Sequence, residues 1–422
     1  MSARLPSSLP IGWTTPPVYA RFSVQLGKML DEKRIAGTHL ASYLRNVDVQ
    51  WDHINTADLP EMDFSAEDRE RFSLREGDLL VCEGGEVGRT AIWDGRLAEC
   101  YFQKAIHRLR PITAHDEPRF FRYFMRTAVE SGLFALATAS TIQHLPAEKL
   151  RIVRYPAPPR LQQRAIADYL DRETARLDAL VAAKQRVLEL LAEKRRALIT
   201  RAVTRGLDPR APLRDSGIPW LGEIPAHWRL ERAKFVFVQS ALPVRDEDEM
   251  VTCFRDGQVT LRRNRREDGF TNANLELGYQ GIHNGQLVLH SMDAFAGAIG
   301  VSDSNGKCSP EYIICDSQTT ETDSYYYGHL LRTMALAGFI QASCPAVRER
   351  APRIRFTDFG EMFVPVPPRD EQRSIVERIG SELTRLDALR SANEHTVALL
   401  KERRAALIAV AVTGRIDVEA VV

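Results

Sequence analysis

The chain has 422 residues, of which 44% are hydrophobic and 27% charged, and its formal net charge is +1. This composition is that of an ordinary water-soluble protein, and the near-neutral charge argues against a protein that coats nucleic acid unaided, although local basic surfaces stay compatible with it. No apolar run approaches the ~20 residues of a membrane span, and Met1–Pro10 lacks a signal-peptide pattern, so we expect a cytoplasmic protein without membrane contact.

The first globular region, roughly residues 1–150, is predicted to be mixed α/β. The segment "REGDLLVCEGGEVGRTAIW" from Arg75 to Trp93 predicts a strand, a glycine-rich turn and a second strand. The segment "FFRYFMRTAVESGLFALA" from Phe120 to Ala137 carries apolar residues at helical spacing, which predicts a helix after the strands.

A long helix is predicted over residues 160–204, which contain no glycine or proline. The pair Pro158-Pro159 marks its start, because proline suits the first helical turn and not the interior. Apolar residues recur at alternating steps of four and three, which predicts a heptad-type seam about 65 Å long. The apolar seam positions are Ile166, Leu170, Leu177, Leu180, Val187, Leu191 and Leu198.

The second globular region, roughly residues 210–360, begins after a linker that contains Gly206 and Pro212. Its segment from Gly285 to Ser302 again predicts a strand, a turn and a strand, and the segment from Tyr325 to Ile340 has helical spacing. Because the order of elements is the same, the two regions are expected to share a fold despite their different sequences.

The second long helix repeats the first without a gap. The segment that begins at Pro367 lies 209 residues after the one at Pro158, and nearly half of the aligned positions are identical. We expect the two helices to pack against each other, with the alternative that each packs on its own globular region. The apolar seam positions of the second copy are Ile375, Ile379, Leu386, Leu389, Leu400 and Leu407.

The chain offers no catalytic or metal-binding motif. Its six cysteines form no CxxC pair and its ten histidines no HExxH, so we expect free, mostly buried thiols and no metal site. The glycine-rich segment from Cys82 to Arg89 lacks the GxGxxG spacing, and the segment from Gly300 to Cys308 lacks required P-loop residues. Both are interpreted as turns.

At several places the chain resembles the specificity subunits of type I restriction–modification systems. The segments "LPIGW" at Leu9 and "DSGIPWLGEIPAHW" at Asp215 resemble the openings of the two target-recognition domains of that family. "PPRLQQRAIADYLD" and "PPRDEQRSIVERI" resemble the openings of its long helices. The first copy has Gln162 where the second has Glu371, the commoner family residue, and this difference is expected to alter only a helix cap.

The resemblance implies α/β (α+β) target-recognition domains in two copies, joined by two long helices that form an antiparallel coiled-coil spacer with pseudo-two-fold symmetry. It implies a non-catalytic subunit that binds double-stranded DNA, carries two methyltransferase subunits on its helices and can be joined by two restriction subunits. S-adenosylmethionine, ATP and Mg belong to those partners, and this chain needs no cofactor. The expected boundaries are 1–157 and 209–366 for the domains, and 158–208 and 367–422 for the helices.

Two unlike domains predict an asymmetric, bipartite DNA target whose gap is set by the spacer. The strongest basic cluster is "LRRNRR", interpreted either as a DNA contact or as a solvated loop that pairs with Glu267 and Asp268. Lys307 is expected in a turn, and four buried-type aromatic residues (Phe120, Phe121, Tyr325 and Tyr326) in the core. The candidate DNA-binding residues are Arg45, Asn46, Arg89, Lys104, Arg262, Arg263, Arg265, Arg266 and Lys307.

Two other functions stay open at this point. A self-contained DNA endonuclease would bring acidic metal ligands together in one domain. A coiled-coil scaffold would have no DNA preference.

Overall fold

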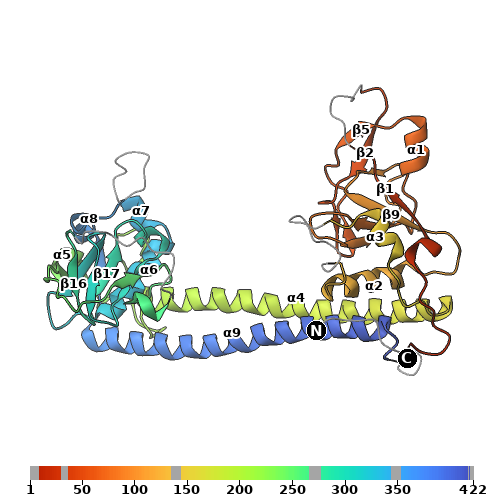
Figure 1. The fold of residues 1–422 in the computed structure, drawn as a ribbon. Coiled ribbons are helices and arrows are strands. Elements are labelled where there is room, and N and C mark those ends of the chain that lie inside the picture. Colours follow the sequence, from red (N-terminus) through yellow and green to blue (C-terminus); the bar gives the residue numbers. More distant parts are fainter. Residues whose placement is uncertain are drawn as a thin grey trace. The chain divides into compact units, whose positions relative to one another are not determined.

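The structure is a computed structural model that describes residues 9–29, 37–134, 144–265, 277–343, 353–416 and 418 (Figure 1). The chain divides into two compact units, residues 1–185 with 395–422 and residues 186–394. Each unit contains one globular domain and one end of each long helix, α4 (Arg160–Arg205) and α9 (Arg369–Val412). The described helices are too polar or too short to cross a membrane.

The first domain is built on an antiparallel sheet with the strand order β1-β9-β6-β7. Side chains of a strand alternate between the two faces, so Leu79 and Val81 of β6 pack with helix α2, whereas Leu80 and Cys82 face a second core. The predicted strand–turn–strand segment is therefore confirmed as β6 and β7. These elements span Phe22–Leu26 (β1), Leu79–Cys82 (β6), Thr90–Ile92 (β7), Ile106–Pro111 (β9) and Pro118–Glu130 (α2).

The second core of this domain lies under a smaller sheet, β5-β2-β8, and a hairpin formed by β3 and β4. Helix α1 is fixed at its start by Ser65, whose side chain accepts from the Asp68 backbone N–H while Asp68 returns the bond. The bounds are Leu40–Leu44 (β2), Val49–Gln50 (β3), His53–Ile54 (β4), Glu61–Asp63 (β5), Tyr101–Phe102 (β8), Val18–Ala20 (η1), Ala66–Phe72 (α1) and Ala147–Ile152 (α3).

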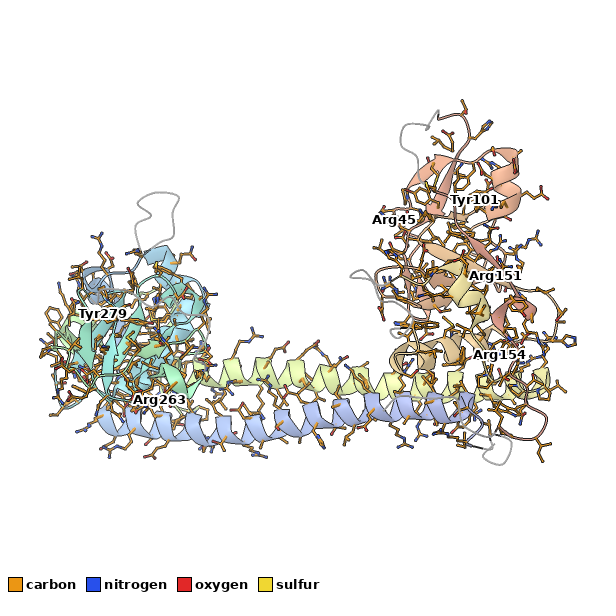
Figure 2. The ribbon with its side chains drawn as sticks, viewed as in Figure 1. Arg45, Tyr101, Arg151, Arg154, Arg263 and Tyr279 are labelled. Carbon is orange, nitrogen blue, oxygen red and sulfur yellow. The ribbon has the colours of Figure 1, made fainter. Side chains whose placement is uncertain are left out.

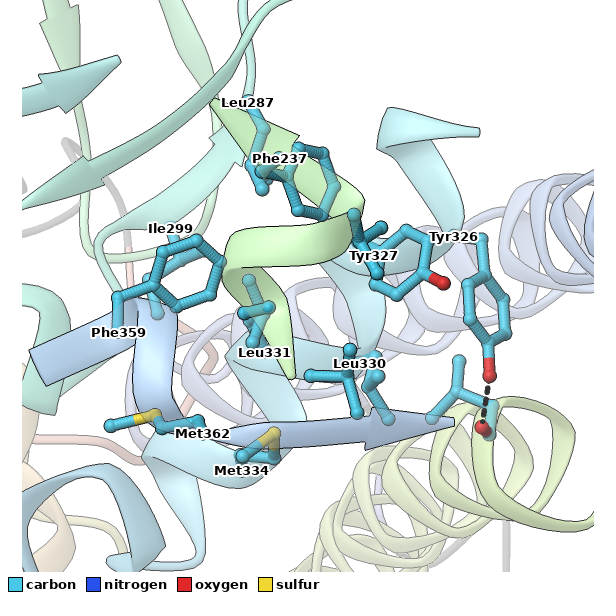
Figure 3. Close-up of a cluster of buried hydrophobic side chains, with 14 of the residues drawn as sticks. Phe237, Leu287, Ile299, Tyr326, Tyr327, Leu330, Leu331, Met334, Phe359 and Met362 are labelled. Atoms are coloured by element: carbon cyan, nitrogen blue, oxygen red, sulfur yellow. Dashed lines mark hydrogen bonds between the residues drawn. The ribbon is translucent and has the colours of Figure 1, made fainter. Parts of the chain in front are cut away.

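The second domain repeats this plan with the order β13-β20-β17-β18. Helix α6 (Ser324–Leu336) covers the sheet as α2 does, and Figure 3 shows its aromatic and aliphatic side chains in the buried cluster. The Tyr326 hydroxyl donates to the Val203 carbonyl of α4 at 2.8 Å. The sheet strands are Phe237–Gln239 (β13), Leu287–His290 (β17), Ile299–Val301 (β18) and Tyr312–Ser317 (β20).

The remaining elements of the second domain are short hairpins and turns around this sheet. Their bounds are Leu213–Asp215 (β10), Glu223–Pro225 (β11), Arg229–Arg232 (β12), Ala233–Val236 (α5), Val251–Cys253 (β14), Val259–Leu261 (β15), Arg262–Asn264 (η4), Gln280–Ile282 (β16), Ala294–Ala296 (η5), Gly306–Cys308 (β19), Phe339–Ser343 (α7), Phe356–Glu361 (α8) and Phe363–Val366 (β21).

Equivalent aromatic contacts recur in the two domains. Trp13 meets Phe120 edge-on at 6.3 Å between ring centroids, and Trp228 meets Tyr326 edge-on at the same distance. The prediction of one fold shared by two unlike sequences is thus confirmed by strand order and by packing. Phe120, Phe121 and Tyr326 are buried as expected, but Tyr325 is 47% exposed because it points away from the sheet side of α6.

Each long helix is joined to its domain by a buried glutamine. The side-chain oxygen of Gln163 accepts from the Glu117 backbone N–H at 2.9 Å, and its amide donates to the Pro158 carbonyl at 2.8 Å. Gln372 makes the same bonds with Asp323 and Pro367, at the same distances. The glutamine of the duplicated Pro-Pro-x-x-x-Gln segment is therefore a domain anchor, and both helices begin directly after their proline pair as predicted.

The residue before each anchor binds a tryptophan. Gln162 accepts from the Trp13 indole N–H at 2.9 Å, and Glu371 accepts from that of Trp228 at 3.0 Å. This side chain therefore joins the opening of the domain to the helix, a role that the sequence did not reveal, while the expectation that the Gln–Glu difference alters a cap and not the function stays a prediction. Either an amide or a carboxylate oxygen can accept this bond, which explains why both residues occur.

The long helices pack antiparallel to each other within each unit. In the first unit Ile166 and Leu170 share a core with Ile408 and Val412, and in the second unit Leu198 packs in the core that contains Ile379. Each helix also contacts its own domain, so both proposed packing arrangements occur together.

One half of the predicted seam is displaced by one residue. Leu180, Val187 and Leu389 are 45%, 39% and 45% exposed, whereas Leu177 and Leu386 are buried at 6% and 4%. The four-and-three spacing fits two neighbouring registers, and polar residues in the true seam concealed it. The inward positions that replace the predicted ones are Thr174, Val181, Leu188 and Arg195, with Leu383, Val397 and Arg404 in the second copy. The other predicted positions, Leu191, Ile375, Leu400 and Leu407, are buried or half-buried.

A reciprocal ion pair crosses the two helices in each unit. Arg404 of α9 pairs with Asp178 of α4 at 2.9 Å, and Arg195 of α4 pairs with Asp387 of α9 at 2.6 Å. Arg195 and Arg404 occupy corresponding positions of the repeat, as do Asp178 and Asp387. The contacts of one unit are therefore repeated in the other with the helices exchanged.

The described cysteines, Cys82, Cys100, Cys253, Cys308 and Cys315, are free and buried, as predicted. Burial raises the pKa of Cys100 to about 12, which keeps its thiol protonated. Cys344 lies outside the described residues.

Replacing Leu177 or Leu386 by Asp should destabilise the helix pair, because a carboxylate would enter a buried apolar position. Removal of a buried leucine alone costs ~2–5 kcal/mol, and burial of an unpaired charge adds to this. Thermal unfolding followed by circular dichroism measures the loss. Leu180→Asp and Leu389→Asp are the matched controls at exposed positions, and a melting temperature lowered equally by all four variants would contradict the observed register.

Candidate nucleic-acid interface

The end of β2, the turn after β6 and the start of β9 lie at one edge of the first domain, together with its four candidate residues. The Gln103 backbone N–H donates to the Leu44 carbonyl at 3.0 Å, and that of Glu83 donates to the Ala105 carbonyl at 2.9 Å. These bonds bring the end of β2 and the turn after β6 to the start of β9. Arg45, Asn46, Arg89 and Lys104 are thus collected from separate parts of the sequence.

Arg45 holds a turn through its own neighbour. Its Nε and Nη2 donate to the two carboxylate oxygens of Asp48 at 2.9 and 2.8 Å, and the hydrogen bond to Asp48 raises the pKa of the guanidinium. The side chain is still 39% exposed, and Figure 2 labels it on the first domain. A guanidinium has five N–H donors, so Arg45 can offer the remaining ones to a ligand.

Arg89 and Asn46 contact each other across the glycine-rich turn. Arg89 Nη2 donates to the Asn46 carbonyl at 2.8 Å, and the Asn46 amide reaches the Gly84 carbonyl at 3.5 Å. Arg89 is only 12% exposed and also pairs with Glu86 at 3.3 Å. Arg89 therefore orders this turn from beneath, whereas Asn46 is half-buried at its surface.

Lys104 is exposed and has no hydrogen-bond or ion-pair partner within the described part of the chain. Its backbone N–H donates to the Lys28 carbonyl at 2.8 Å, which fixes the main chain while the ammonium stays in solvent. Of the four candidates in this domain, it is the one most available to a phosphate.

The basic cluster of the second domain lies in η4 and just after it. Arg263 pairs with Glu249, and Arg265 pairs with Asp256 at 2.7 Å while its guanidinium lies 4.3 Å from the centroid of the Phe254 ring. These two carboxylates come from other segments of the chain. The expected pairing with Glu267 and Asp268 stays a prediction, because Arg266, Glu267 and Asp268 lie outside the described residues. Arg263 remains 57% exposed.

A cavity of about 590 Å³ adjoins this cluster, with Arg262 and Arg265 among its lining residues. Asp256, Asp293 and Arg255 also line it, and Arg255 pairs with Asp293 at 2.9 Å. The cavity therefore carries both signs of charge. Lys307 is half-buried in β19, where its strand pairs with β16, so the expectation that it lies in a turn is wrong.

The residues 48–190 match the family model of the type I restriction modification DNA specificity domain. The type I restriction enzyme EcoBI specificity subunit of Escherichia coli is 22% identical over 387 residues, which cover 84% of this chain and 77% of that protein. Both matches confirm the resemblance of this chain to the specificity subunits of type I restriction–modification systems.

Another relative is the putative type I restriction enzyme MjaX specificity subunit of Methanocaldococcus jannaschii, which is 23% identical over 173 residues. That match covers 40% of this chain and 39% of the relative. It therefore concerns only part of each protein.

Solved structures share the fold over almost the whole chain. One chain from a study of complex assembly and conformational transition in a type I R-M system aligns with a TM-score of 0.69 at 17% identity, covering 97% of this chain and 100% of that one. The HsdS subunit from Thermoanaerobacter tengcongensis aligns with a TM-score of 0.56 at 17% identity, covering 97% and 99%. The antiparallel helices and the mixed α/β domains are thus a fold that this chain shares with those solved structures.

Sequence reasoning missed Trp51, Asp52 and Glu86, which lie beside the candidate edge. Trp51 donates its indole N–H to Glu86 at 2.5 Å, and Asp52 pairs with Arg126 at 3.0 Å. Each is an isolated residue in a short turn, so spacing gave no signal. The positive φ of Asp52, +61°, is a property of the folded backbone alone.

Replacing Arg263 and Arg265 by Ala should weaken DNA binding and reduce its salt dependence. Each lost phosphate contact lowers the slope of log K against log salt by about 1. Binding titrations of the assembled complex at several salt concentrations measure both effects. Arg96→Ala removes an exposed arginine that pairs with Asp94 and is the matched control; unchanged affinity and slope in the double variant would exclude Arg263 and Arg265 from the DNA contact.

Proposed function

We propose that this chain is the DNA-recognition subunit of a type I restriction–modification complex and that each globular domain reads one half of a bipartite, asymmetric double-stranded target. The observation that carries the proposal is the duplicated frame with unlike domains. Both domains have the same sheet order and the same buried glutamine anchor, yet their outer hairpins and candidate edges differ. The same anchor to the helix, repeated in two domains with different candidate edges, suits two domains that recognise different DNA sequences.

Base discrimination would come from a few exposed side chains in each half. A bidentate contact such as guanine with arginine contributes about 1–3 kcal/mol of discrimination. Arg45 in the first domain and Arg263 in the second retain exposed guanidinium groups held by a carboxylate. Their ion pairs fix the direction of each guanidinium, while Lys104 supplies sequence-independent attraction to phosphate.

We propose the middle of the helix pair as the docking surface for methyltransferase subunits. Leu180 and Leu399 are 45% and 50% exposed in the first unit, and their counterparts in the repeat, Leu389 and Leu190, are 45% and 47% exposed in the second. Repeated apolar residues that stay in solvent indicate a surface that another protein covers. One such surface per unit suits two methyltransferase subunits, which two restriction subunits can join.

In this assignment the chain is not catalytic. The methyltransferase subunits bind S-adenosylmethionine, and the restriction subunits use ATP and Mg. No cluster of acidic, histidine or cysteine ligands suited to a metal occurs among the described residues. A self-contained endonuclease is therefore left without a specific observation in its favour, and a scaffold does not account for the two differing edges.

The function is tested by modification-resolved sequencing of host DNA with and without this chain. We expect methylation at a two-part, gapped motif that depends on the chain. Exchange of residues 1–157 for the corresponding domain of another specificity subunit should change one half of the motif and leave the other intact. Methylation without any motif, or a change in both halves, would contradict the proposal, and cleavage of DNA by the purified chain with Mg would favour the endonuclease.

The docking surface makes a separate prediction. Leu180→Glu and Leu389→Glu should each weaken binding of a methyltransferase subunit, because a charge would enter a buried apolar contact, and a loss of about tenfold or more corresponds to ~1.4 kcal/mol or more. Analytical ultracentrifugation gives the number of bound subunits and the affinity. Each single variant should lose one subunit; full occupancy of both sites at wild-type affinity would move the docking surface elsewhere.

A further inference from the structure

The hairpin turn between β3 and β4 carries a carboxylate that meets three arginines. Asp52 Oδ1 lies 3.1 Å from Arg122 Nε, and Oδ2 lies 3.0 Å from Arg126 Nη1 and 3.6 Å from Arg404 Nη2. Arg122 and Arg126 come from α2 and Arg404 from α9, so one side chain joins the domain to a long helix. All of these residues belong to the first unit.

The arginines are themselves held by the other long helix. Arg122 donates to Asp171 at 2.9 Å, and Arg404 pairs with Asp178 at 2.9 Å, both on α4. Arg404 is only 13% exposed, which limits its freedom to turn toward solvent. The turn that carries Asp52 is therefore tied to both long helices through charged groups.

From this turn a chain of contacts leads to the candidate DNA edge. The guanidinium carbon of Arg126 lies 5.1 Å from the ring centroid of Trp51, the residue next to Asp52. The Trp51 indole N–H donates to the Glu86 carboxylate at 2.5 Å. Glu86 in turn pairs with Arg89, which donates to the Asn46 carbonyl. Every link from Arg404 to Asn46 is thus a polar or ring contact within the first unit.

The backbone at Asp52 adds an independent argument. Its φ is +61°, a left-handed conformation that costs a non-glycine residue free energy and that glycine adopts freely. The corresponding hairpin of the second domain, between β14 and β15, uses Gly257 at φ +91°. An Asp in place of glycine at this strained position of the first turn indicates that the carboxylate is kept for its ion pairs with the arginines.

The second domain is joined to its helix differently. Helices α2 and α6 both have 13 residues, and the positions of Arg119, Arg122 and Arg126 are taken by Tyr325, Gly328 and Arg332. In the described part of the chain, Arg332 donates to two backbone carbonyls, those of Gly297 and Arg255, at 3.2 and 3.1 Å. Among the described residues, a carboxylate that meets three arginines, as Asp52 does, is thus a feature of the first domain.

We infer that Asp52 is a positioning residue for target recognition by the first domain: it fixes the β3–β4 turn to the long helices, and through Trp51 and Glu86 it orients the edge formed by Arg89 and Asn46. The inference rests on the proposed function, since it concerns the accuracy with which one half-site is read. Asp52 itself need not touch DNA.

The test uses the full chain assembled with its methyltransferase subunits and compares binding to the methylated motif with binding to DNA altered in either half. Asp52→Asn removes the charge and keeps a residue that tolerates the left-handed conformation. It should reduce discrimination against an altered first half about tenfold and leave discrimination in the second half within about twofold, as expected for a coupling of this kind. Arg404→Gln should do the same, and the double variant should be no worse than either single one.

Two matched controls separate positioning from general destabilisation. Asp94→Asn removes an exposed carboxylate that pairs with Arg96 in the same domain, and Arg195→Gln removes the ion pair with Asp387 that corresponds to Arg404 with Asp178. Neither should alter first-half discrimination. Trp51→Phe keeps a ring under Arg126 but loses the bond to Glu86, and it should reproduce part of the effect even if Asp52→Asn folds poorly.

The outcomes are distinct. A wild-type complex that discriminates neither half would overturn the proposed function itself. A wild-type complex that discriminates both halves, with Asp52→Asn and Trp51→Phe behaving like Asp94→Asn, would overturn only this inference. An equal loss in both halves would also overturn it, because a positioning role in the first domain predicts an effect on one half alone.

Discussion

The architecture depends on one buried amide in each half of the chain. Gln163 and Gln372 lie at the start of a long helix, are 1% and 0% exposed, and bond to the backbone of both the helix opening and the domain. A buried amide that lost these partners would leave several backbone groups unsatisfied, each at a cost of ~1–3 kcal/mol. The anchor therefore fixes where each domain meets its helix, and the tryptophan bonds to Gln162 and Glu371 add a second attachment at the same place.

Most of the fold could be predicted from the sequence, because the strongest sequence patterns occur twice. The proline pairs, the duplicated helical segments and the strand–turn–strand segments predicted the elements and their order, and the structure confirms them. The seam was half wrong because Thr174 and Arg195 occupy inward positions, while Leu180, Val187 and Leu389 are exposed. Spacing reports an apolar face but not whether a partner within the chain or another molecule covers it.

The candidate site was less predictable from sequence. Arg45, Asn46, Arg89 and Lys104 could be named from the sequence as candidate DNA contacts, and the fold brings them to one edge. The structure shows that Arg89 is mostly buried and supports the turn, whereas Lys104 is exposed to solvent. Among the described residues, the carboxylates that pair with Arg263 and Arg265 come from other segments, Glu249 and Asp256. Their use as DNA contacts stays a prediction, as does the relation between helix length and the gap in the target.

The different attachment of the two domains has a consequence for behaviour in salt. Both domains share an apolar core with their helices, but the first domain adds ion pairs of Arg119 with Asp168 and Asp171, which are 54% and 35% exposed. The second domain adds the hydrogen bond from the buried Tyr326 hydroxyl to the Val203 carbonyl. Dissolved ions screen exposed charge pairs and leave apolar contacts intact or strengthened. Rising ionic strength would therefore weaken the attachment of the first domain to the helices before that of the second domain. The protein would then discriminate less well in the half of the target read by the first domain than in the other half.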